Sequence, residues 1–112
     1  MKKNSLTKGE KRAVNELKDF LKELLGGNLV GMKLYGSRAT GDFDRDSDID
    51  IAIVVRGLTG SVRNRIFKKV ADIEVEHLLP LSTLVLSEQE FNRLKSRERR
   101  IALDIENEGI LL

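Results

Sequence analysis

Apolar residues near the start of the chain recur with a helical period. The period begins after Thr7 and Glu10, which have the T-x-x-E spacing of a capping box, and the pair Gly26-Gly27 marks its end. The apolar positions are Ala13, Leu17, Phe20, Leu21 and Leu24. Because these positions share one face at 3.6 residues per turn, the pattern predicts an amphipathic helix that begins at Thr7.

Three short apolar stretches further along have the composition of strands. They are Leu29 to Tyr35, Ile49 to Val55 and Leu81 to Leu86. The second is apolar at almost every position, which is typical of a strand buried on both faces. Between the second and third, a helix is predicted from Ser61, with the buried stripe Val62, Ile66, Val70 and Ile73.

The C-terminal part predicts one more helix. Ser87 and Glu90 form a second capping box, and the inward positions are Phe91, Leu94, Ile101 and Ile105. Glu98 interrupts that stripe, so the run 95–100 is either a solvated middle turn or a partner-facing surface. The apolar ending 109–112 either adds an edge strand or docks on a partner.

These elements predict an α+β fold. A small, three-stranded mixed sheet would be backed by helices in the order α-β-β-α-β-α. The sequence has 112 residues, which suits a single domain over 1–112 with a modest core.

Charge and cysteine content exclude several classes of site. The 20 Lys and Arg residues nearly balance the 18 Asp and Glu residues, so charge alone does not indicate nucleic-acid binding. Any contact with nucleic acid is expected to be indirect. The sequence contains no cysteine, which excludes a disulfide framework and a thiolate zinc site. No apolar run approaches the length of a membrane span, and no signal peptide is evident, so a cytoplasmic location is expected.

Two carboxylates open the most apolar stretch. In a strand, the side chains of Asp48 and Asp50 would share one face with Cα atoms about 6.6 Å apart. Like charges held so close are unfavourable unless a cation lies between them. The pair therefore predicts a site for a divalent metal and a phosphate-containing substrate.

A glycine-rich turn precedes this pair. Gly36 and Ser37 directly follow a predicted strand, where backbone N–H groups and a hydroxyl are free to face an anion. A P-loop does not fit, because Asp42 and Phe43 follow Gly41 where that motif needs Lys and then Ser or Thr. An EF-hand does not fit either, because Ser47 and Ile53 stand where the calcium loop needs Gly and Glu. Asp42, Asp44 and Asp46 are predicted to form a solvated loop, and Tyr35 to be a strand-end packing residue.

The combined spacing resembles a known signature. Gly36-Ser37, ten intervening residues and then Asp48-Ile49-Asp50 are similar to the G-S-x10-D-x-D signature of the DNA-polymerase-β-like nucleotidyltransferase superfamily. Within that superfamily, the short chain resembles the minimal nucleotidyltransferases.

The resemblance implies an activity and its ligands. Asp48 and Asp50 would be the catalytic residues and hold Mg²⁺ or Mn²⁺, while Gly36 and Ser37 bind the phosphates of a nucleoside triphosphate, with ATP expected. Arg38 lies beside the anion site and would either contact the triphosphate or pair with a neighbouring aspartate. A nucleoside monophosphate would pass to an acceptor hydroxyl as pyrophosphate leaves.

The resemblance also implies a partner. Minimal nucleotidyltransferases are often encoded beside small helical proteins of the HEPN type, with which they form toxin–antitoxin pairs. The acceptor would come from such a partner or from self-association of the chain. The alternative is a catalytically weak or inactive nucleotide-binding module that neutralises the toxin by binding alone.

One departure from the superfamily pattern leaves enzymatic activity open. Active members place a third carboxylate on the strand that here reads Leu81 to Leu86, which contains no acid. Strand alternation places Ser82 and Thr83 on opposite faces, so whichever faces the aspartates offers only a neutral hydroxyl. Glu74 or Glu76 would supply the third carboxylate only if the end of the preceding helix reaches the site.

Overall fold

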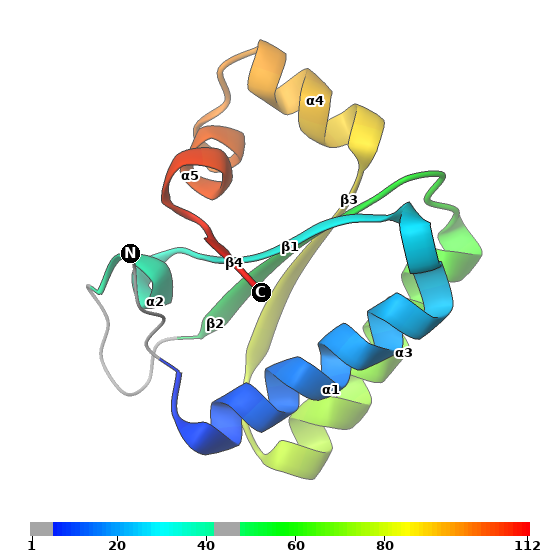
Figure 1. The fold of residues 1–112 in the computed structure, drawn as a ribbon, viewed down its shortest axis with the longest axis vertical. Coiled ribbons are helices and arrows are strands. Elements are labelled where there is room, and N and C mark those ends of the chain that lie inside the picture. Colours follow the sequence, from blue (N-terminus) through cyan, green and yellow to red (C-terminus); the bar gives the residue numbers. More distant parts are fainter. Residues whose placement is uncertain (1–5, 42–47) are drawn as a thin grey trace.

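The computed structural model describes residues 6–41 and 48–112 and has the predicted α+β architecture (Figure 1). Its helices are α1 Lys8–Leu25, the 3-10 turn η1 Gly26–Asn28, α2 Ser37–Thr40, α3 Gly60–His77, α4 Glu88–Ser96 and α5 Arg100–Glu108. Its strands are β1 Leu29–Tyr35, β2 Ile49–Val55, β3 Leu81–Ser87 and β4 Ile110–Leu111. No helix in the described part of the chain is long and apolar enough to cross a bilayer.

The sheet has four strands in the order β3-β2-β1-β4. β2 runs parallel to β3, and β1 is antiparallel to both β2 and β4. The fourth strand comes from the apolar C-terminal residues, where Ile110 pairs with Leu34 and the N–H of Leu112 donates to Met32 O at 3.0 Å. Of the two predicted roles for this ending, the edge strand is therefore the one observed within the chain.

Helices cover both faces of the sheet. α1 and α3 lie side by side on one face, and α4 and α5 lie on the other (Figure 1). Along β2, Ile49, Ile51 and Ile53 pack beneath α1 and α3, whereas Ala52 and Val54 face α4 and α5. Strand alternation therefore puts Asp50 on the α4/α5 face, and it is the one residue of β2 that is not buried.

The prediction of one continuous C-terminal helix was wrong. The chain bends at residues 97–99, where Glu98 has φ 52° and the N–H of Arg99 donates to Leu94 O at 3.0 Å. The basic run offers no apolar side chain to bury, so a straight helix would carry its second half away from the sheet. The bend returns Ala102 and Ile105 to the core, and it leaves the predicted inward residue Ile101 41% exposed.

The helix starts follow the sequence closely. The capping boxes at Thr7 and Ser87 are both present, with Glu10 N to Thr7 Oγ1 at 3.1 Å and Glu90 N to Ser87 Oγ at 3.0 Å. Thr59 caps α3, which places the start of that helix one residue before the predicted one.

A buried ion pair ties α2 to α1. The Arg38 guanidinium lies 3.0 Å from Glu10 Oε2 and donates to Glu10 Oε1 at 3.1 Å, and the Arg38 side chain is only 5% exposed. Burial opposes the charged form of Glu10, but hydrogen bonds from the Thr7 backbone and from Arg38 outweigh it and hold the pKa of Glu10 below its ordinary value of 4.5. The short helix after Gly36 is thereby fixed against the first turn of α1.

Glu10→Gln should lower the free energy of unfolding at pH 7 by about 1.5–3 kcal/mol, because it removes the charged acceptor of Arg38. A carboxylate with a lowered folded pKa stabilises the fold above its unfolded pKa, and that contribution is lost as pH falls through the folded value. The variant should therefore lose less stability than wild type between pH 7 and about pH 3. Denaturant unfolding across this range is the measurement.

Glu23→Gln is the matched control. Glu23 is an exposed residue of α1 that forms no ion pair with the described residues. Equal pH dependence of Glu10→Gln and wild type would show that the buried pair contributes nothing to stability.

Candidate active site

Three neighbouring strands bring one residue each to the same edge of the sheet. Asp50 on β2 is paired with Tyr35 on β1 and with Ser82 on β3. Paired residues on adjacent strands point to the same face, so these three side chains form a row on the α4/α5 face. Asp48 precedes the row and is exposed, whereas Asp50 is half-buried. The predicted pair therefore lies where β1 ends and β2 begins.

Gly36 lies directly against this row. Its backbone has φ 74°, and a Cβ atom built there would overlap Asp50 Oδ2 and come within 3.3 Å of Asp50 Cγ. The sequence indicated glycine for approach to an anion, and the structure adds a second reason, which is room for the Asp50 carboxylate. Ser37 follows as the first residue of α2, at the same end of the sheet.

The surroundings of Asp50 in this row make its negative charge unfavourable unless a cation compensates it. Burial raises the pKa of Asp50 above its ordinary value of 3.8, the hydrogen bond donated by Ser82 opposes that rise, and the charge of Asp48 adds to it. Burial and the charge of Asp50 also raise the pKa of Tyr35. A divalent cation fits this donor set, because Mg²⁺ and Mn²⁺ prefer carboxylate oxygens and neutralise paired negative charges.

The described ion pair of Arg38 is with Glu10 of α1. Burial of its side chain suits a role in positioning α2, and a contact between Arg38 and a phosphate stays a prediction. Asp42, Asp44 and Asp46, predicted to form a solvated loop, lie outside the described residues.

Of the four candidates for the third acidic position, only Ser82 adjoins Asp50 in the sheet. Thr83 pairs with Ile51 and so shares the opposite face, beneath α1 and α3. Glu74 Oε2 accepts the N–H of Leu81 at 3.1 Å. Glu76 lies at the end of α3 beside Glu16 and His77. The position next to Asp50 therefore carries a hydroxyl.

Tyr35 is the neighbour of the site that sequence reasoning missed. It was interpreted as a packing residue, and it does pack against the cluster beneath α4 and α5. The signal that could have found it is its position immediately before Gly36, because antiparallel pairing of β1 with β2 then sets it opposite the second aspartate.

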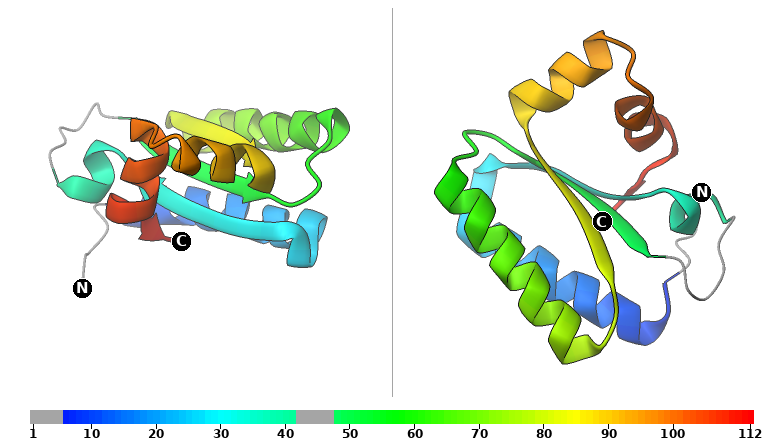
Figure 2. Two further views of the ribbon diagram at one scale, coloured as in Figure 1. Left: turned by 90° about the horizontal axis from the view of Figure 1, so that it is seen from above. Right: turned by 180° about the vertical axis from the view of Figure 1, so that it is seen from behind.

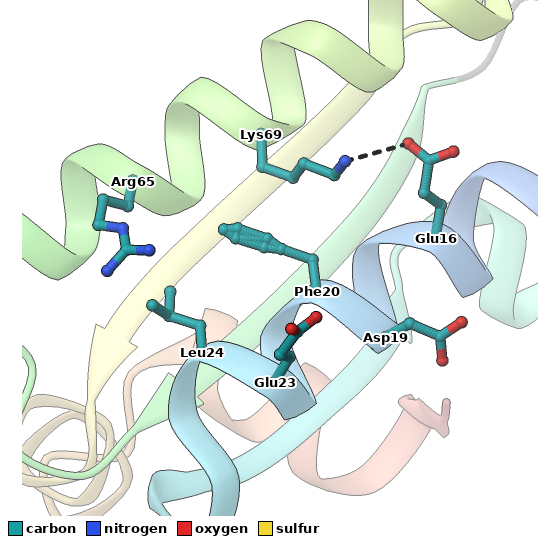
Figure 3. A pocket seen from close by; sticks show the side chains of 7 residues that line it. All are labelled: Glu16, Asp19, Phe20, Glu23, Leu24, Arg65 and Lys69. Carbon is teal, nitrogen blue, oxygen red and sulfur yellow. Dashed lines mark ion pairs between the residues drawn. The ribbon is translucent and has the colours of Figure 1, made fainter.

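A wide groove of about 690 Å³ lies elsewhere, between α1 and α3 (Figure 3). Phe20 and Leu24 line it, and Lys69 Nζ reaches across it to Glu16 Oε2 at 3.4 Å. The groove is on the helical layer opposite the face that carries Asp50. Its mixed charges and internal ion pair give it no evident part in the chemistry at the aspartates.

Comparison with known proteins gives one family match and one close sequence relative. Residues 14–112 match the family described as “Nucleotidyltransferase domain”. A protein of Methanocaldococcus jannaschii named “Putative protein adenylyltransferase” is 35% identical over 88 residues, which cover 75% of this chain and 80% of that protein.

Two solved toxin–antitoxin structures share the fold. One, crystallised with AMP-PNP, has a TM-score of 0.56 and 19% identity, and the match covers 90% of this chain and 70% of that chain. The other, a mutant of the toxin–antitoxin MntA-HpeT, has a TM-score of 0.53 and 17% identity, with 87% and 69% covered. The family match spans most of the sequence, including the whole row at the sheet edge, and the chain therefore belongs to the nucleotidyltransferase domain family.

Proposed function

We propose that this protein binds a divalent metal and a nucleoside triphosphate between Asp48, Asp50 and the Gly36-Ser37 turn, and transfers a nucleoside monophosphate to an acceptor hydroxyl. The observation that carries the proposal is the seating of the half-buried Asp50 carboxylate against the backbone of Gly36. That contact brings the phosphate-binding turn and the metal-binding carboxylates into one site. Membership of the nucleotidyltransferase family supports the same assignment.

The reaction exchanges one bond at the α-phosphorus for another and releases one proton. The acceptor oxygen bonds to the α-phosphorus, the bond from that phosphorus to the bridging oxygen breaks, and pyrophosphate leaves with the electron pair while the hydroxyl proton passes to water. Mg²⁺ or Mn²⁺ held by Asp48 and Asp50 would neutralise the charge that develops on the phosphates. The Gly36-Ser37 turn would hold those phosphates in line with the acceptor.

ATP is the proposed nucleotide. The archaeal relative is named as a protein adenylyltransferase, and one structure with this fold contains AMP-PNP. The proposed acceptor is a hydroxyl on a partner protein, because the two structures compared above are toxin–antitoxin structures. In that arrangement the chain acts as the antitoxin of a HEPN-type toxin.

A second candidate function is supported by Ser82. A hydroxyl beside Asp50 supplies neither a base nor a third negative charge, and general-base catalysis is typically worth about 10² to 10⁴ in rate. Under this alternative, the protein binds metal and nucleotide and neutralises its partner by association, with slow transfer or none.

Magnesium with ATP at 100 times its dissociation constant should stabilise the wild-type fold by about 2.7 kcal/mol, through linkage between binding and folding. The double variant Asp48→Asn/Asp50→Asn should lose most of this gain, because neutral amides bind Mg²⁺ far more weakly than carboxylates do. Thermal melts with and without Mg-ATP measure the shift. Equal shifts in the two proteins would exclude these aspartates from the site.

Gly36→Ala should lower the free energy of unfolding by about 1–3 kcal/mol and abolish the Mg-ATP shift, because the added methyl group displaces the Asp50 carboxylate. Gly60→Ala is the control, since a Cβ there would meet no atom within 4 Å beyond its own helical turn. Melting curves and nucleotide titrations of both variants are the measurements. Wild-type nucleotide affinity in Gly36→Ala would contradict the proposed contact between turn and carboxylate.

Ser82→Asp should raise the rate of nucleotide transfer by about 10² to 10⁴, because it places a third carboxylate beside Asp50. Ser82→Asn, of similar size but uncharged, should not. Transfer of label from α-³²P-ATP to the co-purified helical partner is the measurement. Wild-type transfer at about 1 s⁻¹ or faster, with no gain in Ser82→Asp, would rule out the binding-only alternative.

A further inference from the structure

Three side chains that the proposed function does not use meet where the end of α3 packs against α1. They are Glu16 of α1 and the neighbouring Glu76 and His77 of α3. One carboxylate oxygen from each glutamate and one imidazole nitrogen all lie within 4.8 Å of one another. Figure 2 shows α1 and α3 running side by side in the view from behind. This packing brings together Glu16 and His77, which are 61 positions apart in the sequence.

The contact between Glu16 and His77 is long for a hydrogen bond. His77 Nε2 lies 3.4 Å from Glu16 Oε1, whereas most N–H···O hydrogen bonds are about 2.7–3.2 Å long. Two ligand atoms that each lie about 2.05 Å from a tetrahedral metal ion are about 3.3 Å apart. The nitrogen and the oxygen therefore have the separation that a shared four-coordinate ion requires.

The carboxylates of this cluster are poorly satisfied by the chain itself. Glu16 Oε2 is buried and accepts no hydrogen bond from any residue in 6–41 or 48–112. Lys69 Nζ lies 3.4 Å from this atom, beyond the usual length of about 2.7–2.9 Å for a charge-assisted bond. Glu76 is exposed and pairs with no other residue in the same ranges. Both carboxylates would therefore gain a partner if a cation bound between them.

Lys69 has room to leave Glu16. Its side chain is 32% exposed and lines the wide groove between α1 and α3 (Figure 3). Its ammonium group lies 5.7 Å from the centre of the Phe20 ring, a contact that stays available when the ammonium moves. Partly exposed ion pairs contribute little to stability. A divalent ion, which carries twice the charge, therefore competes effectively with Lys69 for the Glu16 carboxylate.

We propose that Glu16, Glu76 and His77 form a second metal site, separate from the two aspartates of the candidate active site, and that this site binds zinc. Imidazole nitrogen together with carboxylate oxygen suits Zn²⁺, whereas Mg²⁺ prefers oxygen ligands alone. Three protein ligands leave the fourth position of a tetrahedral ion to water. The bound ion joins α1 to the end of α3.

The site stabilises the fold and takes no part in nucleotide transfer. Asp50 faces α4 and α5, whereas α1 and α3 cover the other face of the sheet. Zinc binding is therefore independent of the proposed function, and either can fail without the other. Because the ion binds only where two helices meet, it should raise the melting temperature of the chain.

Calorimetric titration of Zn²⁺ into tag-free Asp48→Asn/Asp50→Asn isolates this site from the candidate active site. One ion should bind per chain with a dissociation constant of about 1–50 µM. His77→Gln in the same background should weaken binding at least tenfold, because it removes the only imidazole of the sequence. No binding at about 1 mM Zn²⁺, or unchanged affinity in His77→Gln, would overturn the proposal.

Asp19→Asn is the matched control for Glu16→Gln. Asp19 is an exposed carboxylate of the same helix, lines the same groove and lies outside the cluster. Each variant removes one negative charge, so the comparison separates coordination from general attraction of a cation. Glu16→Gln should weaken zinc binding at least tenfold, and Asp19→Asn should leave it within about twofold of the parent. Equal losses in the two variants would contradict the site.

Lys69→Met should tighten zinc binding by about three- to tenfold, because it removes the cation that competes for Glu16 and keeps an unbranched apolar side chain in the groove. The same titration measures this change. Weaker binding in Lys69→Met would count against the proposed competition and against Glu16 as a ligand.

The imidazole of the wild-type chain supplies a readout that depends on no variant. Because the sequence contains a single histidine, the ring protons of His77 give one resolved set of resonances in an NMR spectrum. Zn²⁺ should shift or broaden these resonances, and Mg²⁺ at the same concentration should leave them in place. Zinc binding that leaves the His77 resonances unchanged would put the ion elsewhere and overturn the proposal.

Discussion

The contact between the Gly36 backbone and the Asp50 carboxylate constrains the rest of the molecule. Only glycine leaves room for the carboxylate, and only a strand that begins immediately after Asp48 presents that carboxylate at the right edge. Strand β2 is in turn held by burial on both faces, through isoleucines beneath α1 and α3 and smaller residues beneath α4 and α5. The two-sided core therefore fixes the position of Asp50, the one charged residue of β2.

Local sequence signals were sufficient for the main elements. Both capping boxes start helices where the sequence predicts them, and the apolar run of β2 is buried as its composition indicates. Strand alternation also predicts that only one of Ser82 and Thr83 faces the aspartates, with Glu74 and Glu76 left as further candidates for the third carboxylate. These features depend on residues within a few positions of one another, which is the range over which a single sequence is informative.

Features that depend on distant pairing could not be predicted in the same way. The choice of Ser82 over Thr83 follows from the register of β3 against β2, and the register is set by the core as a whole. The partner of Arg38 is 28 residues away in α1. The bend near Glu98 reflects competition between local helix propensity and return of Ala102 to the core, and tertiary packing prevailed.

One carboxylate links the start of α1 to the turn that follows β1. Glu10 Oε1 accepts the backbone N–H of Thr7 at 2.9 Å within the capping box, and the same side chain holds Arg38 beside Gly36. Helix ends fray readily, and fraying of this end requires Glu10 to release both partners. The first turn of α1 and the turn at the site therefore open as one cooperative unit, so hydrogen exchange at the amino end of the helix reports how firmly the distant turn is held.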